Sequence, residues 1–445
     1  MNRFRLSLIL LIISFLFLPA CVLGTEEQLL IPEIDYHYFK LDNGLQVYVI
    51  EDSSVPLVEL GIFYKVGAID EPPGLTGISH FLEHAMFLGT ESLGKGQLDQ
   101  LVDLAGGYTN AATSFDFTYY YMEVPSSLLE LAIALEADRM VNLKLDPVEI
   151  EREREVILQE RRQGLENVVF NAGLEQLQAA AFADTSLEHQ VIGWAEDIQR
   201  ITVEDLASYY RTYYSPNNAI LVVVGDATVD QVKDLTAKYF GDFEPQEIDR
   251  PRFKVAPQGQ GRVYELQCHT NIPIALLLYH TPAGDDPDLL SIGVILNILV
   301  NSEGSRVKQE LQKNQQLIIE TAGVPRELRV PSYTLIYLVP TSMETLPLAL
   351  QAFDTEIERL IEEGITEEEF QIVKKHVMRS MIFAQKDPRN MAINIAYSAL
   401  SFDQPNLLSQ QLASLSELTV EDIQAAAAKY FTEDNRIIGL LVPIN

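Results

Sequence analysis

The sequence predicts an α+β fold made of two homologous halves, and an internal repeat is the main reason for this prediction. The segment LTVEDIQAAAAKYFTEDNRIIGLLVP, which starts at Leu418, matches ITVEDLASYYRTYYSPNNAILVVVGD, which starts at Ile201, at an offset of 217 residues. Residues 241–261 contain three prolines and show no periodicity, which is typical of a linker. The chain therefore reads as a duplication with two halves of roughly 200 residues each.

Strand and helix patterns can be followed in order through the first half. The run HYFKLDNGLQVYVIED has a turn signal, Asp42-Asn43-Gly44, between two alternating stretches, which predicts a pair of strands. Gly106-Gly107 separates a short helical pattern from a segment rich in Tyr, Phe and Thr, as expected before strands. The elements expected after the first two strands are a strand over 55–67, helices over 95–105, 126–142 and 146–163, strands within 108–124, and a helix and a buried strand over 202–224.

The stretch HFLEH, residues 80–84, carries the first candidate site. The apolar spacing of GLTGISHFLEHAMFLGT favours a helix, with Thr76 as its cap, and this places His80 and His84 one turn apart on one face. Two imidazoles with Glu83 beside them are what a catalytic zinc site needs. The order H-x-x-E-H is the inverse of the H-E-x-x-H metalloprotease helix. Because such pairs also occur on ordinary amphipathic helices, the hypothesis requires a third ligand.

The candidate for the third ligand lies in EIEREREVILQERRQG, residues 149–164. As a helix, this segment places Glu153 and Glu160 on the same side as Val156 and Ile157. Buried carboxylates are costly unless they are paired or bound to a metal. The alternative is a charged surface helix, and the combination with the two histidines favours the metal site.

These motifs together resemble the pitrilysin and insulinase metallopeptidases, in the branch of the mitochondrial processing peptidase and its bacterial relatives. The resemblance rests on HFLEH, on Glu160 at 76 positions after His84, and on Glu153 seven residues before Glu160. Three further segments support it: GGYTNAATSFDFTYYYMEVP, VIGW and YYSPNNAILVVVGD. It extends from about Tyr36 to the C-terminus.

The resemblance implies a fold and a set of roles. Each half would be a mainly antiparallel sheet with helices packed on it. The chain would be a zinc metalloendopeptidase acting on peptides or unfolded segments, and Zn²⁺ its cofactor. The implied ligands are His80, His84 and Glu160, with Glu83 as general base and later proton donor, Glu153 beside the site without touching the metal, and Asn110 and Ala111 as substrate contacts on an edge strand.

The second half departs from the family pattern. The repeat offset carries His80 and His84 onto Asn297 and Asn301, so this half lacks metal ligands. Active single-chain relatives carry an Arg and a Tyr seven positions apart, for which this chain has Gln312 and Ile319. The pair Arg326 and Tyr333 has the same spacing and is an alternative. A glycine-rich loop of the family is reduced to NSEGS. We therefore expect a homologous partner chain that supplies the Arg and Tyr, with a homodimer as the other reading.

The N-terminus predicts export. MNRFRLSLILLIISFLFLPAC has two arginines followed by an apolar run too short for a comfortable membrane span. The end, Leu18-Pro19-Ala20-Cys21, resembles a bacterial lipobox, which would anchor the mature chain through lipid at Cys21. Ordinary cleavage near Val22-Leu23-Gly24 and an uncleaved anchor are the alternatives. Either form of export places the protein in the bacterial cell envelope or periplasm.

Composition restricts the partners. The formal net charge of −32 argues against nucleic acid and anionic lipid surfaces, and it is compatible with cationic peptide substrates. The predicted divisions are a signal over 1–24, a zinc-bearing domain over 33–240, the linker 241–261 and a homologous domain over 262–445. Two other functions stay open: a scaffold subunit of the same fold, and an envelope protein that binds peptides through zinc without cutting them.

Overall fold

The computed structural model describes residues 34–250, 253–254 and 261–444. The predicted export signal and Cys21 lie outside these residues, as does part of the predicted linker. In the described ranges, no helix combines the length and apolar character needed to cross a membrane. The described residues fall into one compact unit that contains both halves of the repeat.

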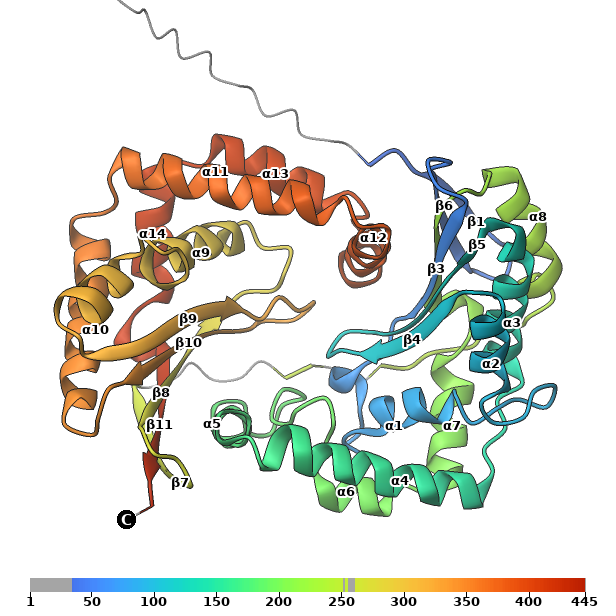
Figure 1. The fold of residues 1–445 in the computed structure, drawn as a ribbon, viewed down its shortest axis with the longest axis horizontal. Helices are drawn as coiled ribbons and strands as arrows, with labels where there is room; N and C mark the ends of the chain where they lie inside the picture. Colours follow the sequence, from blue (N-terminus) through green and yellow to red (C-terminus); the bar gives the residue numbers. More distant parts are fainter. Residues whose placement is uncertain (1–33, 251–252, 255–260, 445) are drawn as a thin grey trace, which may run out of the picture. The chain divides into compact units, whose positions relative to one another are not determined.

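The first sheet has six strands in the order β1-β2-β6-β3-β5-β4 (Figure 1). Only β2 and β6 run parallel among these pairs, so the prediction of a mainly antiparallel sheet is confirmed. Strand β4 forms one edge, with β5 as its single neighbour in the sheet. The strands are β1 (His37–Lys40), β2 (Gln46–Glu51), β3 (Leu57–Tyr64), β4 (Tyr108–Thr113), β5 (Thr118–Pro125) and β6 (Ala219–Gly225).

Eight helices belong to the described part of the first half. Helix α4 begins where Asp146 accepts a hydrogen bond from the Val148 amide, with Pro147 at the first helical position. It runs directly into a π-helical turn, Arg162–Glu166. The helices are α1 (Ile78–Ala85), α2 (Gln97–Leu104), α3 (Leu129–Val141), α4 (Pro147–Arg161), α5 (Val169–Ala181), α6 (Ala195–Arg200), α7 (Val203–Tyr213) and α8 (Val229–Phe240).

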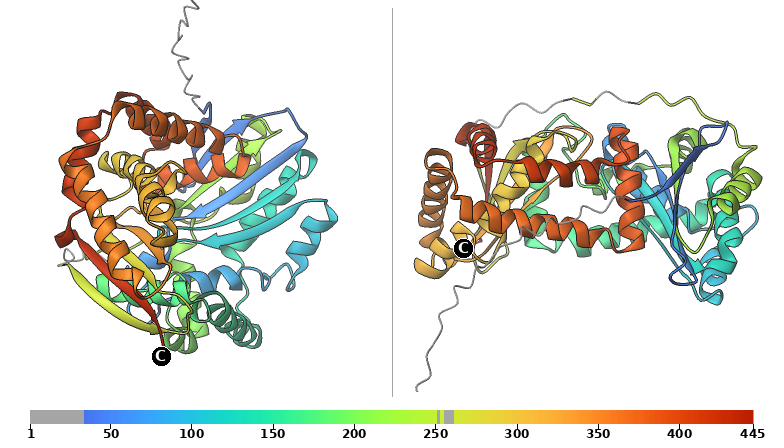
Figure 2. Two further views of the ribbon diagram at one scale, coloured as in Figure 1. Left: turned by 60° about the vertical axis from the view of Figure 1, so that its left-hand side comes forward. Right: turned by 90° about the horizontal axis from the view of Figure 1, so that it is seen from above.

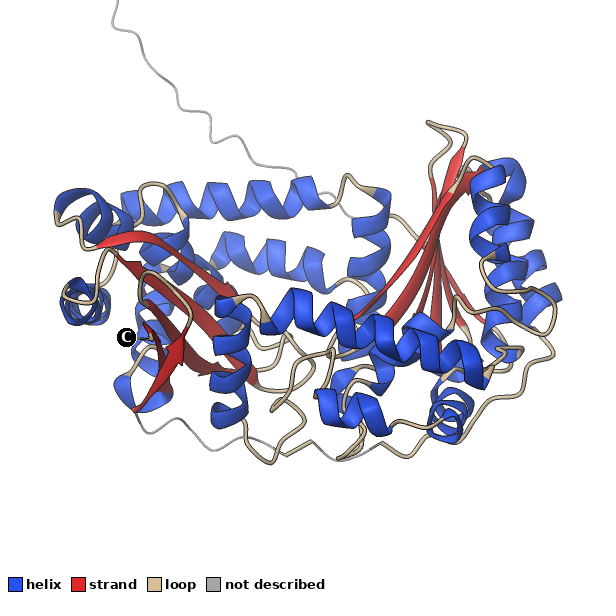
Figure 3. Ribbon diagram, turned by 60° about the horizontal axis from the view of Figure 1, so that its bottom comes forward, coloured by secondary structure: helices blue, strands red, loops and turns tan. Residues whose placement is uncertain are grey.

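The second sheet has five strands in the order β7-β11-β8-β10-β9, with β7 and β11 parallel and the other pairs antiparallel. In Figure 3 its strands are the red ones near the C-terminus. Its strands are β7 (Arg262–Cys268), β8 (Ile274–Thr281), β9 (Ile318–Pro325), β10 (Ser332–Pro340) and β11 (Arg436–Pro443). Its helices are α9 (Asp288–Leu296), α10 (Thr345–Glu362), α11 (Glu367–Ala384), α12 (Pro388–Phe402), α13 (Leu407–Glu417) and α14 (Val420–Tyr430), with π-helical turns at Asn297–Asn301 and Lys308–Asn314.

The repeat is visible in local detail. An offset of 217 residues carries α7 onto α14 and the start of β6 onto the start of β11. Both helices begin with the same capping box, in which a threonine hydroxyl accepts from the amide of an aspartate that in turn accepts from the threonine amide. The pairs are Thr202 with Asp205 and Thr419 with Asp422. The prediction of two homologous α+β halves is confirmed.

One helix from each half packs on the sheet of the other half. Helix α12 packs its apolar residues, among them Ile395 and Ala396, on the face of the first sheet that carries Ile220 and Val222 (Figures 1 and 2). Helix α5 packs in the same way on β11. The approach of α5 is close, because a Cβ at position 173 would lie 1.9 Å from a methyl carbon of Leu441 and the Leu441 side chain would have to move. The two halves therefore share cores.

Candidate metal centre

Helix α1 is positioned by groups that the sequence did not reveal. Its first residue follows Gly77, whose φ of 85° is in the left-handed region that favours glycine. Thr76 does not cap the helix, so that prediction is wrong: its hydroxyl donates to Asp197 (2.7 Å). The buried carboxylate of Glu71 instead accepts from the amides of Gly77 (2.7 Å) and Ser79 (2.9 Å). These contacts satisfy amides that a helix start leaves without partners.

The structure brings His80, His84 and Glu160 together. The Nε2 atoms of the two histidines lie 3.9 and 3.4 Å from Oε2 of Glu160, and all three donor atoms lie within 4.8 Å of one another. Ligands of a tetrahedral zinc ion at its usual bond lengths are separated by about 3.3 Å. Two imidazoles and one carboxylate are also a donor set that catalytic zinc sites use. The three residues therefore fit a zinc ion in both chemistry and spacing.

The electrostatics of the three side chains also fit a cation. Burial, together with the neighbouring His84, lowers the pKa of His80 to about 4, so its imidazole is neutral at pH 7. Burial also acts to lower the pKa of His84, but its hydrogen bonds to Glu153 and Glu160 outweigh this and raise that pKa to about 9. The hydrogen bond to His84 lowers the pKa of Glu160. The site thus gathers negative charge around two imidazoles.

Glu153 lies behind His84. Its Oε1 is 2.9 Å from Nδ1 of His84, the ring atom opposite the nitrogen that faces Glu160. A proton held between Nδ1 and this carboxylate leaves Nε2 with a free lone pair toward the proposed metal. Glu153 therefore contacts the ring of His84, and its role beside the metal stays a prediction.

Glu83 faces the same site from α1. The hydroxyl of Thr113, the last residue of β4, donates to Oε2 of Glu83. Burial raises the pKa of Glu83, although the hydrogen bond from Thr113 acts in the opposite direction. A cavity of about 490 Å³ opens beside Glu83 and is also lined by His84, Glu153 and Asn110. A carboxylate beside a cavity, with a pKa raised above its usual range, can accept and later return a proton.

The predicted substrate residues lie on the edge strand β4. Asn110 donates from Nδ2 to the Tyr108 hydroxyl (3.0 Å), and its Oδ1 accepts from the amide of Ala111 (2.9 Å). In the register with β5, Ala111 lies opposite Tyr120. The Asn110 side chain therefore accepts from the Ala111 amide, the group that an added peptide strand would bind.

The second half does not form an equivalent site. Among the described residues, the single group of three or more potential ligands that converge is the one in the first half. Asn301, at the position equivalent to His84, donates to the Gly323 carbonyl (2.9 Å) and accepts from its amide (2.8 Å). Gln312 and Ile319 stand at the positions where relatives have the arginine and the tyrosine, and Gln312 donates to the carbonyl of Ile319 (2.5 Å).

The other candidates from the sequence, Arg326, Tyr333 and His189, make contacts with other residues. Tyr333 is 1% exposed and its hydroxyl donates to Oε1 of Gln178 (2.8 Å), whereas Arg326 lies over the Phe115 ring (5.3 Å). His189 is buried, and its Nδ1 contacts the carbonyl of Gln190.

Sequence reasoning missed Glu71 and Thr113. Neither residue belongs to a recognisable motif. Glu71 contacts backbone amides, and Thr113 contacts Glu83, which is distant in the sequence.

Comparisons with known proteins agree with this geometry. Residues 46–194 match the family described as insulinase (peptidase family M16), and residues 200–377 match the peptidase M16 inactive domain. The chain is 27% identical over 409 residues to the zinc protease PqqE of Helicobacter pylori, covering 91% of this chain and 92% of that protein. It is 35% identical over 205 residues to the human mitochondrial-processing peptidase subunit beta, covering 45% of this chain and 41% of that protein.

Solved structures show the same fold. A protease from Helicobacter pylori superposes with a TM-score of 0.86 at 26% identity, covering 92% of this chain and 99% of that one. A peptidase M16 inactive domain from Pseudomonas fluorescens gives a TM-score of 0.83 at 16% identity, covering the same share of each chain. A solved protease thus shares the architecture that surrounds His80, His84 and Glu160.

Proposed function

Because this chain belongs to the insulinase (M16) family of peptidases, we propose that it is a zinc metalloendopeptidase that hydrolyses peptides or unfolded polypeptide segments. The observation that carries the proposal is the convergence of His80, His84 and Glu160 beside the partly buried carboxylate of Glu83. A scaffold protein has no need for this combination of three ligands and a base.

Each side chain has a task in the proposed reaction. A zinc ion held by His80, His84 and Glu160 would supply Lewis acidity and lower the pKa of a water molecule at its open position. Glu83 takes the proton that the attacking water loses and delivers it to the nitrogen of the leaving amine. Glu153 holds the ring of His84 in one orientation through Nδ1.

The substrate is proposed to bind as an extended strand along β4. This strand has β5 on one side only, so its other edge can pair with a peptide backbone. Asn110 would release the Ala111 amide when the peptide pairs with it. The net charge of −32 favours cationic peptides as they approach.

A homologous partner chain is part of the proposal. The second half has Gln312 and Ile319 where active single-chain relatives have an arginine and a tyrosine, and Tyr333 is buried. A partner that carries this pair would stabilise the developing oxyanion, a contribution that mutagenesis in other hydrolases puts at about 10²–10³-fold in rate. A homodimer is the alternative, and robust turnover by the isolated chain would support it.

Export to the cell envelope with a lipid at Cys21 is proposed from the sequence alone. The mature protein should then partition into the detergent phase, and Cys21→Ser should release it or block processing. A mature N-terminus at Thr25, found by intact mass, would instead indicate ordinary secretion.

The catalytic proposal is tested by measuring zinc content and hydrolysis of a quenched fluorescent peptide, with the partner present if the isolated chain is inactive. Glu83→Gln should keep zinc and lose hydrolysis by several powers of ten, on the order of what loss of a general base and its electrostatics costs. Glu155→Gln, the same change at an exposed position on α4, is the matched control and should behave as wild type. Full activity of Glu83→Gln would overturn the mechanism, and zinc binding without hydrolysis in the wild type would indicate a peptide-binding protein.

A further inference from the structure

The first end of the edge strand β4 is in contact with an arginine from the second half. Arg389, in the first turn of α12, donates from Nε to Oε1 of Glu59 (2.9 Å), a carboxylate that is 4% exposed. Its guanidinium lies 4.1 Å from the ring centre of Tyr121 and 5.6 Å from that of Tyr108. The hydroxyl of Tyr108 in turn holds the side chain of Asn110. Arg389 therefore supports the part of β4 on which the substrate is proposed to lie.

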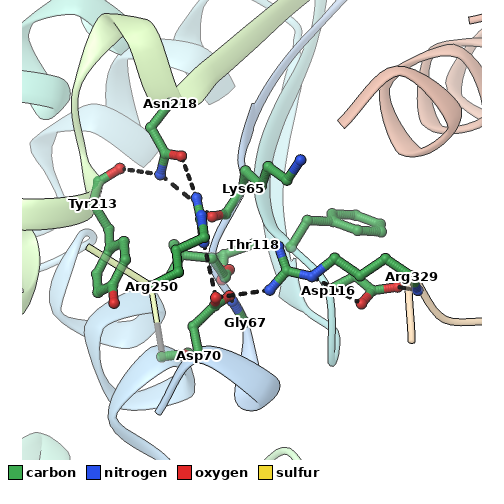
Figure 4. A network of polar contacts seen from close by, with 12 residues as sticks. Lys65, Gly67, Asp70, Asp116, Thr118, Tyr213, Asn218, Arg250 and Arg329 are labelled. Carbon is green, nitrogen blue, oxygen red and sulfur yellow. Dashed lines mark hydrogen bonds and ion pairs between the residues drawn. The ribbon is translucent and has the colours of Figure 1, made fainter. Parts of the chain in front are cut away.

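The other end of β4 meets a second arginine from the same half. Arg329, in the loop between β9 and β10, donates from Nη2 to Oδ1 of Asp70 (2.7 Å) and from its backbone amide to Oδ2 of Asp116 (3.0 Å), as Figure 4 shows. Asp116 belongs to the turn that connects β4 to β5, and its side chain is 1% exposed. The same turn accepts backbone hydrogen bonds from Ala68 and Ile69, next to Asp70. Arg329 thus joins the turn to the segment that precedes α1.

We propose that Arg329 and Arg389 are positioning residues of the peptidase, which hold the two ends of β4 so that Thr113 and the free edge of the strand stay aligned with Glu83. The proposal rests on the proposed function, and it gives the second half a part in the reaction although this half lacks metal ligands. Between the two arginines lie the Thr113 hydroxyl that contacts Glu83 and the Asn110–Ala111 pair that would meet the substrate.

Attachment of the two halves does not require these arginines. The apolar contact of α12 with the first sheet, through Ile395, Ala396 and Leu400, already joins them. Buried ion pairs contribute little net stability because desolvation offsets their attraction, whereas they do restrict geometry. Of their two carboxylates, Asp116 belongs to the turn between β4 and β5, and Glu59 belongs to β3, which pairs with the other side of β5. Alignment of β4 is the role that this placement suits.

Arg250 provides a matched control. It also donates to Oδ1 of Asp70 (2.8 Å), but its second partner is Asn218 rather than the β4–β5 turn (Figure 4). Arg250→Ala and Arg329→Ala therefore each remove one cation from the same carboxylate. The backbone hydrogen bond from Arg329 to Asp116 remains in Arg329→Ala, so a difference between the two variants reports the ion pair of the Arg329 side chain with Asp116 (Nε to Oδ1, 3.6 Å) rather than the charge balance of Asp70.

The first experiment measures amide hydrogen exchange of residues 108–117 and zinc content in Arg329→Ala, Arg389→Ala and Arg250→Ala of the full chain. Zinc should stay at the wild-type level in all three. Exchange should accelerate about tenfold in the first two variants, as expected for loss of one coupled contact, and stay unchanged in Arg250→Ala. Arg389→Lys, which keeps a cation beside Glu59, should restore most of the protection. If Arg389→Ala fails to fold, Arg389→Ala with Glu59→Gln removes the carboxylate that would be left unpaired.

Kinetics of the active enzyme then separate positioning from general loosening. Arg389→Ala should mainly raise KM, because it supports the Asn110 region, and Arg329→Ala should mainly lower kcat, because its end of β4 carries Thr113. The kcat losses of Arg329→Ala and Thr113→Val should not add, since both act through Glu83. Unchanged exchange in both arginine variants, or equal acceleration in Arg250→Ala, would overturn the proposal. A wild type that cuts no peptide would overturn the proposed function, whereas the exchange data would still decide whether the arginines hold β4.

Discussion

In the first half, His84 of α1 turns its imidazole toward Glu160 of α4, whereas its counterpart Asn301 in the second half binds the backbone of β9 at Gly323. The side-chain amide of Asn301 takes the place that a neighbouring strand would take, so it occupies part of the edge of β9. On the corresponding edge of β4, Asn110 from within the strand accepts from the Ala111 amide. The comparison suggests that one helix position either builds the metal site or closes an edge strand.

The helices that carry these positions also differ between the two halves. The residues equivalent to 80–84 form the π-helical turn Asn297–Asn301, which lies close enough to β9 that a Cβ at Gly323 would be 3.0 Å from a methyl carbon of Val300. In the first half a π-helical turn instead follows Glu160, and the equivalent part of α11 is a regular helix. π-Helical turns re-register a helix by one residue and often accompany functional sites. The π-helical turns of the two halves thus lie at positions that are not equivalent.

The largest expected effect comes from removing a ligand in the first half. His84→Ala should lose zinc and, with it, hydrolysis by several powers of ten, since loss of one of three ligands leaves Glu83 without an activated water. Metal analysis and peptide turnover measure this. Glu160→Ala should also lose zinc, and an unchanged zinc content in that variant would remove Glu160 from the ligand set.

A second prediction tests whether the second half can be made catalytic. Gln312→Arg with Ile319→Tyr introduces the pair that active single-chain relatives carry, and kcat/KM of the isolated chain should rise by up to about 10²-fold, the scale of an oxyanion contact. Ile319 is 48% exposed, so a larger side chain can be placed there. The swapped variant, Gln312→Tyr with Ile319→Arg, is the control. No gain with zinc still bound would show that these two positions do not reach the substrate.

Glu153 should have a smaller effect than the ligands. Glu153→Gln keeps an oxygen near Nδ1 of His84 but removes the charge, and zinc affinity should fall by about 10–100-fold, as is usual for a partner behind a ligand. Competition with a chelator measures the affinity. Glu151→Gln, at an exposed position on the same helix, should leave it unchanged. A change as large as that of Glu160→Ala would mean that Glu153 is itself a ligand.

The sequence predicted the fold class through repeating patterns, and it predicted through a motif and a family resemblance that His80, His84 and Glu160 would converge, as they do. Periodicity placed α4 and the strands, and the spacing of His80, His84 and Glu160 carried the metal hypothesis. The contacts that orient α1 were not accessible in this way. Thr76 looks like a helix cap, but the start of α1 is satisfied by Glu71, which approaches only through the fold of the preceding turn. Arg329 and Arg389 act across more than 200 residues of chain, and no local pattern marks such partners.

The smallest expected effect lies in the second half and concerns stability rather than activity. Asn301→Ala leaves both the amide and the carbonyl of the buried Gly323 without the contacts that Asn301 makes, which should lower the free energy of unfolding by about 1–3 kcal/mol. Asn297→Ala is the matched control, because the Asn297 side chain only donates to the Gly293 carbonyl of its own helix, and it should cost less. Denaturant titration at equal zinc occupancy measures both. Since neither residue faces Glu160, zinc content should stay at the wild-type level, and loss of zinc in Asn301→Ala would show that the closed edge of β9 supports the metal site of the other half.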